Sequence, residues 1–184
     1  KQRVIIEASI VVQAPPTVVF RFYEQLDHLR YVSAERRREW CKARDQRIDV
    51  GREYEVHINQ GRHAIMLRVR TVRIDRDRCI EDEFLNWPLK GARHVQRFEP
   101  QDDGRTTQVH ELNHWEPPWY AKPTVKKHEW EQTRFFEEKL ANGKRVIEAV
   151  YAVRGDDAFT RSVVEETRAV GVDPVIDDAD DRAG

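Results

Sequence analysis

The chain has 184 residues, 39% hydrophobic and 35% charged, which is typical of one globular domain with a wet surface. Basic and acidic residues nearly cancel, 32 against 33, and no apolar run approaches the roughly 20 residues that cross a bilayer. These features exclude membrane-spanning, collagen-like and disulfide-rich classes, and they predict a cytoplasmic protein in which Cys41 and Cys79 are reduced thiols.

The chain opens with a segment in which apolar residues recur at every second position: Val4, Ile6, Ala8, Ile10 and Val12. This period predicts a strand with one face against a core. Pro15-Pro16 ends the strand, and proline is well placed at the start of a helix because it lacks the N–H that would be unbonded there. Apolar spacing over residues 17–32 then predicts one or two short helices.

Six strand-like segments separated by turn residues follow, at 44–50, 53–59, 63–74, 78–85, 92–99 and 106–115. Within 63–74 the apolar phase changes, so we expect a bulge near Arg70 or Thr71. Asp102-Asp103-Gly104 is a strong hairpin signal between the last two segments. The run predicts an antiparallel sheet.

The period becomes helical over residues 124–153, with a stripe that includes Phe136, Leu140, Ile147 and Val150. Beyond it, residues 155–184 contain nine acidic and three basic residues. Their few apolar residues offer little area to offset the entropy of ordering. We therefore expect a folded domain at 1–154 and a mobile or partner-dependent acidic extension at 155–184 that is dispensable for folding.

Basic residues do not indicate a nucleic-acid partner. The extension has a net charge of −6, which leaves only +5 for residues 1–154. Arg36-Arg37-Arg38 forms a basic cluster just before Trp40. Contact with nucleic acid or anionic lipid is one interpretation of this cluster, but the wide spread of arginine along the chain favours a solvated face.

Several motifs occur in an order that resembles the START-like superfamily, which includes the birch-pollen-allergen-like proteins and the polyketide cyclase/dehydrase group. They are the opening segment Ser9 to Phe20 with its Ala14-Pro15, the loop Trp87-Pro88-Leu89-Lys90-Gly91, the pair His94 and Phe98, the turn Asp103-Gly104-Arg105-Thr106, and the closing helix from Phe136 to Ile147. The resemblance covers roughly residues 3–153.

The resemblance implies an α+β helix-grip fold. A curved antiparallel sheet of about six or seven strands would wrap on a long C-terminal helix, with two short helices after the first strand. It also implies an internal cavity that binds a small hydrophobic or amphipathic molecule, for transport or sequestration. The alternative is a cyclase/dehydrase-type enzyme that uses cavity histidines for proton transfer. We expect no cofactor, and a homodimer is compatible with the sequence.

Histidines provide the best candidates for chemistry. If the hairpin turn centres near Asp102-Asp103, the numbers of opposed residues sum to about 204–206, which places His94 near His110. Five residues then share one face, which we expect to line the cavity: His94, Phe98, His110, Leu112 and His114. Imidazoles can be structural, can move protons or contact a polar ligand group near neutral pH, or can bind a metal. Of the nearest carboxylates, Asp82 and Glu111, the second has the opposite parity.

Aromatic residues gather in the loops at one end of the predicted sheet: Trp87, Trp115, Trp119 and Tyr120. They either gate the cavity or plug the junction between helix and sheet. The complete set of expected ligand-binding residues is Tyr54, Leu67, Asp82, Trp87, His94, Phe98, His110, Leu112, His114, Trp119, Phe136 and Leu140.

Overall fold

The computed structural model describes residues 3–42, 47–117 and 125–176. The strands are β1 (Val4–Val12), β2 (Arg38–Cys41), β3 (Glu53–Gln60), β4 (His63–Asp75), β5 (Cys79–Phe84), β6 (Arg93–Gln101) and β7 (Thr106–Trp115). The helices are α1 (Pro16–Tyr23), α2 (Leu29–Val32), α3 (Val125–Arg154) and α4 (Val163–Ala169), with 3₁₀ turns η1 (Leu26–His28), η2 (Asp102–Gly104) and η4 (Gly155–Asp157). No helix within the described ranges could cross a membrane.

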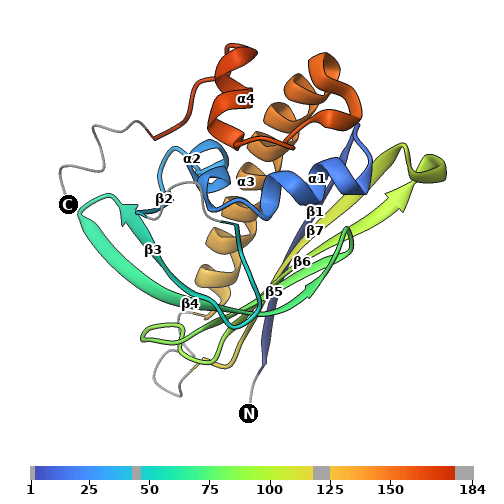
Figure 1. Cartoon of the computed structure of the whole chain (residues 1–184). Helices are drawn as coiled ribbons and strands as arrows, with labels where there is room; N and C mark the ends of the chain where they lie inside the picture. The colour runs from blue at the N-terminus through green and yellow to red at the C-terminus, as the bar shows by residue number, and fades with distance from the viewer. Residues whose placement is uncertain (1–2, 43–46, 118–124, 177–184) are drawn as a thin grey trace.

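The seven strands form one antiparallel sheet in the order β1-β7-β6-β5-β4-β3-β2. The sheet curls around α3, while α1 and α2 close the upper end of the grip (Figure 1). This arrangement confirms the expected α+β helix-grip fold. The ladder between β4 and β5 shifts register between Thr71 and Arg73, as the change of apolar phase predicted.

One predicted strand is misplaced. Its segment 44–50 lies partly outside the described residues, and Arg47 forms only an isolated bridge with Gln25. The edge strand is instead β2, which begins within the basic cluster at Arg38. The periodicity argument did not predict β2, because Glu39 occupies a buried position where that argument expects an apolar side chain.

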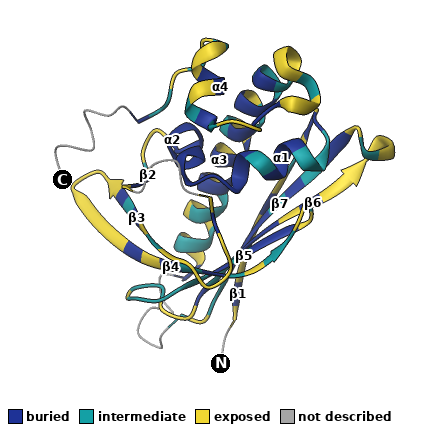
Figure 2. Ribbon diagram, in the orientation of Figure 1, coloured by how far each residue is buried: buried dark blue, intermediate teal, exposed yellow. Residues whose placement is uncertain are grey.

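The core lies between the concave face of the sheet and α3 (Figure 2). The predicted stripe of α3 is buried, from Phe136 through Leu140 and Ile147 to Val150. Gly143 also lies on this stripe, and only glycine fits there, because an added Cβ would be 2.5 Å from the hydroxyl oxygen of Tyr23 on α1.

The first part of the C-terminal extension is packed against the body, contrary to the expected mobility. Phe159, Val163 and Ile176 are fully buried. The side-chain amide of Gln25 donates to the carbonyl oxygen of Phe159 and accepts from the backbone N–H of Val163. Residues 177–184, which include the acidic run at 177–181, lie outside the described residues. The boundary at residue 154 stays a prediction.

Candidate functional site

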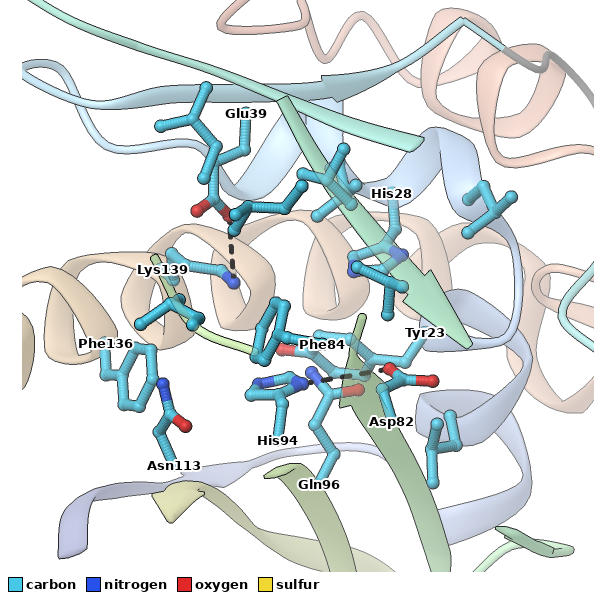
Figure 3. Close-up of a pocket in the computed structure, with 18 of the residues that line it drawn as sticks. Tyr23, His28, Glu39, Asp82, Phe84, His94, Gln96, Asn113, Phe136 and Lys139 are labelled. Atoms are coloured by element: carbon cyan, nitrogen blue, oxygen red, sulfur yellow. Dashed lines mark ion pairs between the residues drawn. The ribbon is translucent and has the colours of Figure 1, made fainter. Parts of the chain in front are cut away.

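A cavity lies between α3 and the concave face of the sheet, and it encloses about 770 Å³ of empty space, including the part that opens to solvent. Apolar side chains from η1, α2, the sheet, the loops and α3 form much of its wall (Figure 3): Leu26, Leu29, Ile48, Val56, Ile58, Leu67, Val69, Ile80, Phe84, Leu89, Phe135 and Phe136. Concave walls that are largely apolar and carry a few polar groups are typical of small-molecule sites.

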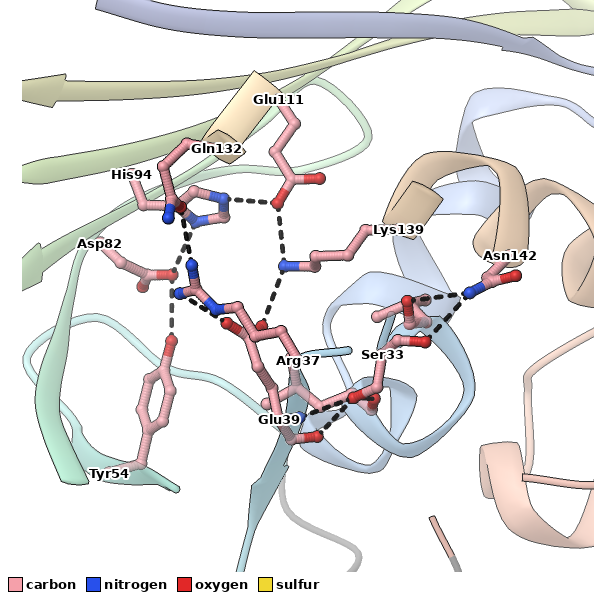
Figure 4. Close-up of polar contacts among 12 residues, drawn as sticks. Ser33, Arg37, Glu39, Tyr54, Asp82, His94, Glu111, Gln132, Lys139 and Asn142 are labelled. Atoms are coloured by element: carbon pink, nitrogen blue, oxygen red, sulfur yellow. Dashed lines mark hydrogen bonds and ion pairs between the residues drawn. The ribbon is translucent and has the colours of Figure 1, made fainter. Parts of the chain in front are cut away.

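A buried lysine organises the polar part of the cavity. Lys139 extends from α3, and its Nζ lies 3.0 Å from Oε1 of Glu111 on β7 and 3.3 Å from Oε2 of Glu39 on β2 (Figure 4). Glu39 also pairs with Arg37, whose Nη2 is 3.0 Å from Oε1. Arg37 donates from Nη1 to the side chain of Gln132 on α3. These contacts tie the edge of the sheet to the long helix.

His94 on β6 continues this network across the sheet. Its Nε2 is 2.9 Å from Oε1 of Glu111, and its Nδ1 is 3.9 Å from Oδ2 of Asp82 on β5. Asp82 accepts hydrogen bonds from the hydroxyls of Tyr54 and Thr71, at 3.0 and 2.8 Å. The result is a continuous polar chain from β2 through α3 and β7 to β6, β5, β3 and β4.

Contacts within this polar network set the protonation states of its side chains. Burial alone would lower the pKa of His94, but the carboxylates of Asp82 and Glu111 outweigh it and raise that pKa to about 9. Burial would raise the pKa of Glu111, but Lys139 and His94 lower it to about 2. Burial would lower the pKa of Lys139, but the carboxylates of Glu111 and Glu39 hold it above its ordinary value. At neutral pH, His94 is therefore an imidazolium beside two carboxylates.

A second histidine at the cavity has the opposite character. His28 is buried, and burial lowers its pKa to about 4, so its ring is neutral near pH 7. Its Nδ1 lies 2.7 Å from the carbonyl oxygen of Gln25, and the ring packs against Phe22 and Tyr23. His28 thus adds an uncharged polar group to the wall opposite His94.

The structure brings five of the expected ligand-binding residues to the cavity wall: Tyr54, Leu67, Asp82, His94 and Phe136. Phe98 and Leu140 are buried in the core but do not line the cavity. Trp87 is 75% exposed, and Trp119 and Tyr120 lie outside the described residues. The ring of Trp115 packs against His128 of α3, as the interpretation as a helix–sheet plug predicts.

The expected shared face of the histidines is wrong. His94 pairs with Asn113, so the numbers of opposed residues sum to 207 instead of 204–206. The turn takes four residues, 102–105, between the last pair Gln101 and Thr106. A shift of one residue moves every side chain of a strand to the other face.

His110, Leu112 and His114 consequently lie on the outer face of β7. Two carboxylates flank His110, with Glu7 at 3.6 Å and Glu99 at 3.5 Å. Nδ1 of His114 is 2.8 Å from Nη2 of Arg3. Leu112 packs with Cys79 and Val95 in a small separate cluster. Across the residues that the structure describes, no group of three or more His, Cys, Asp and Glu side chains is arranged to hold a metal ion.

Sequence reasoning named Glu111 only as a nearby carboxylate of the opposite parity, and it did not predict several polar residues of the cavity wall: His28, Arg37, Glu39, Gln96, Asn113, Gln132 and Lys139. A signal existed for Lys139, which is three residues after Phe136 and one before Leu140, on the buried stripe of α3. Glu111 and Asn113 needed the correct hairpin register, and Arg37 and Glu39 lay in a segment whose composition indicated a solvated surface.

Comparison with known proteins gives a fold relationship. No protein-family model and no curated protein matches the chain. Among solved structures, the Polyketide_cyc-like protein Cgl2372 from Corynebacterium glutamicum is similar, with 15% identity and a TM-score of 0.54 over 80% of this chain and 93% of that one. Protein CV1439 from Chromobacterium violaceum has 18% identity and a TM-score of 0.58 over 78% and 96%. Protein NE0264 from Nitrosomonas europaea has 10% identity and a TM-score of 0.63 over 80% of this chain and 96% of that one.

At these identities the likeness concerns the fold. The proteins that share this fold include a polyketide-cyclase-like member. The chain therefore has the helix-grip fold of these proteins, in agreement with its resemblance to the START-like superfamily.

Proposed function

We propose that the protein binds a small amphipathic molecule in the cavity, with the apolar part against the sheet and α3 and a polar end at His94. The observation that carries this proposal is the position of an imidazolium within a largely apolar enclosure. The helix-grip fold of the structural neighbours, which suggests a ligand-binding cavity, also supports it.

One nitrogen of His94 is suited to contact a ligand. Nε2 is engaged by Glu111 at 2.9 Å. Nδ1 is 3.9 Å from Asp82, which is longer than a hydrogen bond. A ligand oxygen that accepts from the Nδ1 proton would replace a long ion-pair contact by a charge-assisted hydrogen bond.

Filling the cavity tests the proposal. Leu67 is 2% exposed on the cavity wall, so Leu67→Trp should remove space for a ligand. We expect native mass spectrometry of the protein purified from its source to detect a retained small molecule, and Nile red to bind with enhanced fluorescence. Leu67→Trp should abolish both.

Ile5→Trp is the matched control, because Ile5 is on the exposed outer side of β1 and lies outside the cavity. It should retain both signals. Circular dichroism must show that both variants are folded. If wild-type protein binds neither a natural molecule nor Nile red, or if folded Leu67→Trp binds as wild type does, the proposal is wrong.

A specific observation favours an enzyme of the cyclase/dehydrase type as a second candidate: His94 is an acid beside a carboxylate. In a dehydration, Asp82 would take the proton on the carbon next to a ketone. The bond from the neighbouring carbon to its hydroxyl would break, and the imidazolium would give that hydroxyl a proton, so that water leaves. Transfer of the proton from Asp82 to His94 would restore both groups.

The β-hydroxyketone 4-hydroxy-4-phenylbutan-2-one tests this candidate, because loss of water produces an enone with strong ultraviolet absorption. An enzyme should produce the enone faster than buffer, and His94→Gln should remove the excess rate without removing Nile red binding. Equal rates with and without protein would reject this chemistry for that substrate class and leave binding as the function.

A further inference from the structure

We infer that the cavity selects an uncharged ligand that carries a hydroxyl group and discriminates against carboxylates of the same size. This inference rests on the proposed binding function and specifies its ligand class. Two independent observations lead to it: the charges at the cavity are already compensated, and two polar atoms in its wall have no partner.

The charged groups at the cavity are balanced. The three cations are Arg37, Lys139 and the imidazolium of His94, and the three carboxylates that they contact are Glu39, Glu111 and Asp82. The remaining titratable side chains of the wall add no charge near pH 7. Burial lowers the pKa of His28 to about 4 and raises the pKa values of Tyr23 and Tyr54.

A bound carboxylate would therefore enter a site without a free counter-charge. It would have to displace Glu39, Glu111 or Asp82 from a cation, which would leave a buried carboxylate unpaired in a medium of low polarity. The presence of lysine and arginine in a cavity usually suggests an anionic ligand. Here Lys139 already contacts Glu39 and Glu111, and both terminal nitrogens of Arg37 contact Glu39 and Gln132.

The unpartnered atoms indicate what the ligand offers instead. Asn113 is 7% exposed and lines the cavity beside its register partner His94. Its Oδ1 is buried without a hydrogen-bond partner among the described residues, as is Nε of Arg37 in the same wall. Figure 3 places the amide of Asn113 next to Phe136, near the ring of His94.

One of these atoms accepts and the other donates a hydrogen bond. Leaving such groups unsatisfied in a buried site is unfavourable, so a ligand that supplies the missing partner gains affinity. A hydroxyl can donate to Oδ1 of Asn113 and accept from an N–H group, without adding charge. A carboxylate can only accept, so it could pair with Nε of Arg37 but would place a charged acceptor against the acceptor atom Oδ1 of Asn113.

Three aromatic probes of matched size separate charge from hydrogen bonding: 2-naphthol, 2-naphthoic acid and 2-methylnaphthalene. Isothermal titration calorimetry at pH 7 with the full chain would measure each affinity. We expect 2-naphthol to bind at least tenfold more tightly than the ionised acid. We also expect it to bind several-fold more tightly than the methyl compound.

Two variants address the two observations separately. Glu39→Gln removes one negative charge at nearly constant size, so it should raise the affinity for the ionised acid about tenfold and change that for 2-naphthol less than threefold. Glu99→Gln is the matched control, since Glu99 is on the outer face. Asn113→Leu should reduce the advantage of 2-naphthol over 2-methylnaphthalene to less than twofold.

The outcomes distinguish this inference from the binding function. If the ionised acid binds as well as or better than 2-naphthol, or if all three probes bind equally, the inference is overturned and binding stands. If no probe binds, binding itself is overturned for molecules of this size. Should Glu39→Gln fail to fold, the comparison of the three probes on the wild-type protein still decides.

Discussion

The two faces of the β6–β7 hairpin carry the same kinds of side chain in different surroundings. On the concave face, His94 contacts Glu111, and their side chains are 16% and 1% exposed. On the outer face, His110 contacts Glu7 and Glu99, which are 54% and 56% exposed. The ring of His110 is 22% exposed, but its two carboxylate partners remain hydrated, and pairs with hydrated partners contribute little to stability. The inner pairs must compensate each other, because water no longer does so.

The C-terminal extension shows the same contrast between buried and exposed residues, and its removal should cause the largest loss of stability. Truncation after Arg154 removes Phe159, Val163 and Ile176, which are fully buried. Burial of one such side chain contributes about 1.5–3 kcal/mol, so we expect a loss of roughly 4 kcal/mol or more. In thermal unfolding this corresponds to a decrease in Tm of about 10 °C or more.

The control is a chain that ends at Ile176, which lacks four aspartates of the acidic run. It should melt within about 2 °C of the full chain, since residues 177–184 contain few apolar side chains. A truncation after Arg154 that melts like the full chain would show that the extension is dispensable, as its composition suggested.

The fold was predictable from sequence because its signals are local. The alternation in β1, the prolines before α1 and the stripe on α3 each follow from the residues of one element. The site depends on relations between elements. The residues of β7 that share the concave face with His94 could be identified only from the register of β6 with β7. Because the turn has four residues and not an odd number, Glu111 and Asn113 face the cavity, and His110 lies on the outer face.

Composition also misled wherever burial was decided by a distant partner. Glu39 can be buried because Lys139 and Arg37 neutralise its charge. The residues near Glu39 in the sequence do not predict the contact with Lys139. Gln25 is likewise buried, and it anchors the extension through contacts with the carbonyl oxygen of Phe159 and the backbone N–H of Val163. A charged segment can therefore be buried when other elements of the fold supply the side chains that neutralise its charges.

Removal of one inner charge is the second largest expected effect. Lys139→Ala leaves Glu39 and Glu111 buried without their shared cation, and breaking a buried pair in this way costs about 3–5 kcal/mol. Urea denaturation at pH 7 would measure the loss. Lys139→Met, which keeps the apolar stem, should lose nearly as much. A loss below about 1 kcal/mol in both variants would mean that the inner carboxylates remain hydrated.

The pH dependence of stability should differ in sign between inner and outer histidines. The pKa of His94 is raised to about 9, so its stabilising contribution is complete below the unfolded value of about 6.5 and is lost as pH rises to 9. His94→Gln should therefore flatten the decrease in unfolding free energy between pH 6.5 and 9, which we expect to be on the order of 2–3 kcal/mol in wild type.

Outer His114 serves as the contrast, because burial and Arg3 lower its pKa. A lowered pKa opposes folding as pH falls below about 6.5, so His114→Gln should increase stability on the acidic side and leave the alkaline decrease unchanged. Urea titrations at pH 5, 6.5 and 9 would separate the two. Identical pH profiles for His94→Gln and wild type would contradict the charge assigned to His94.

The smallest effect is expected on the outer face of the neighbouring strands. Arg70 and Glu83 form an ion pair at 3.0 Å, but their side chains are 42% and 24% exposed. Because hydrated pairs contribute about 0–1 kcal/mol, Arg70→Ala should lower the free energy of unfolding by less than about 1 kcal/mol. The double variant with Glu83→Ala should show a coupling within the same limit. A coupling of about 3 kcal/mol, as large as the loss of stability expected for Lys139→Ala, would show that the ion pairs on the two faces contribute similarly.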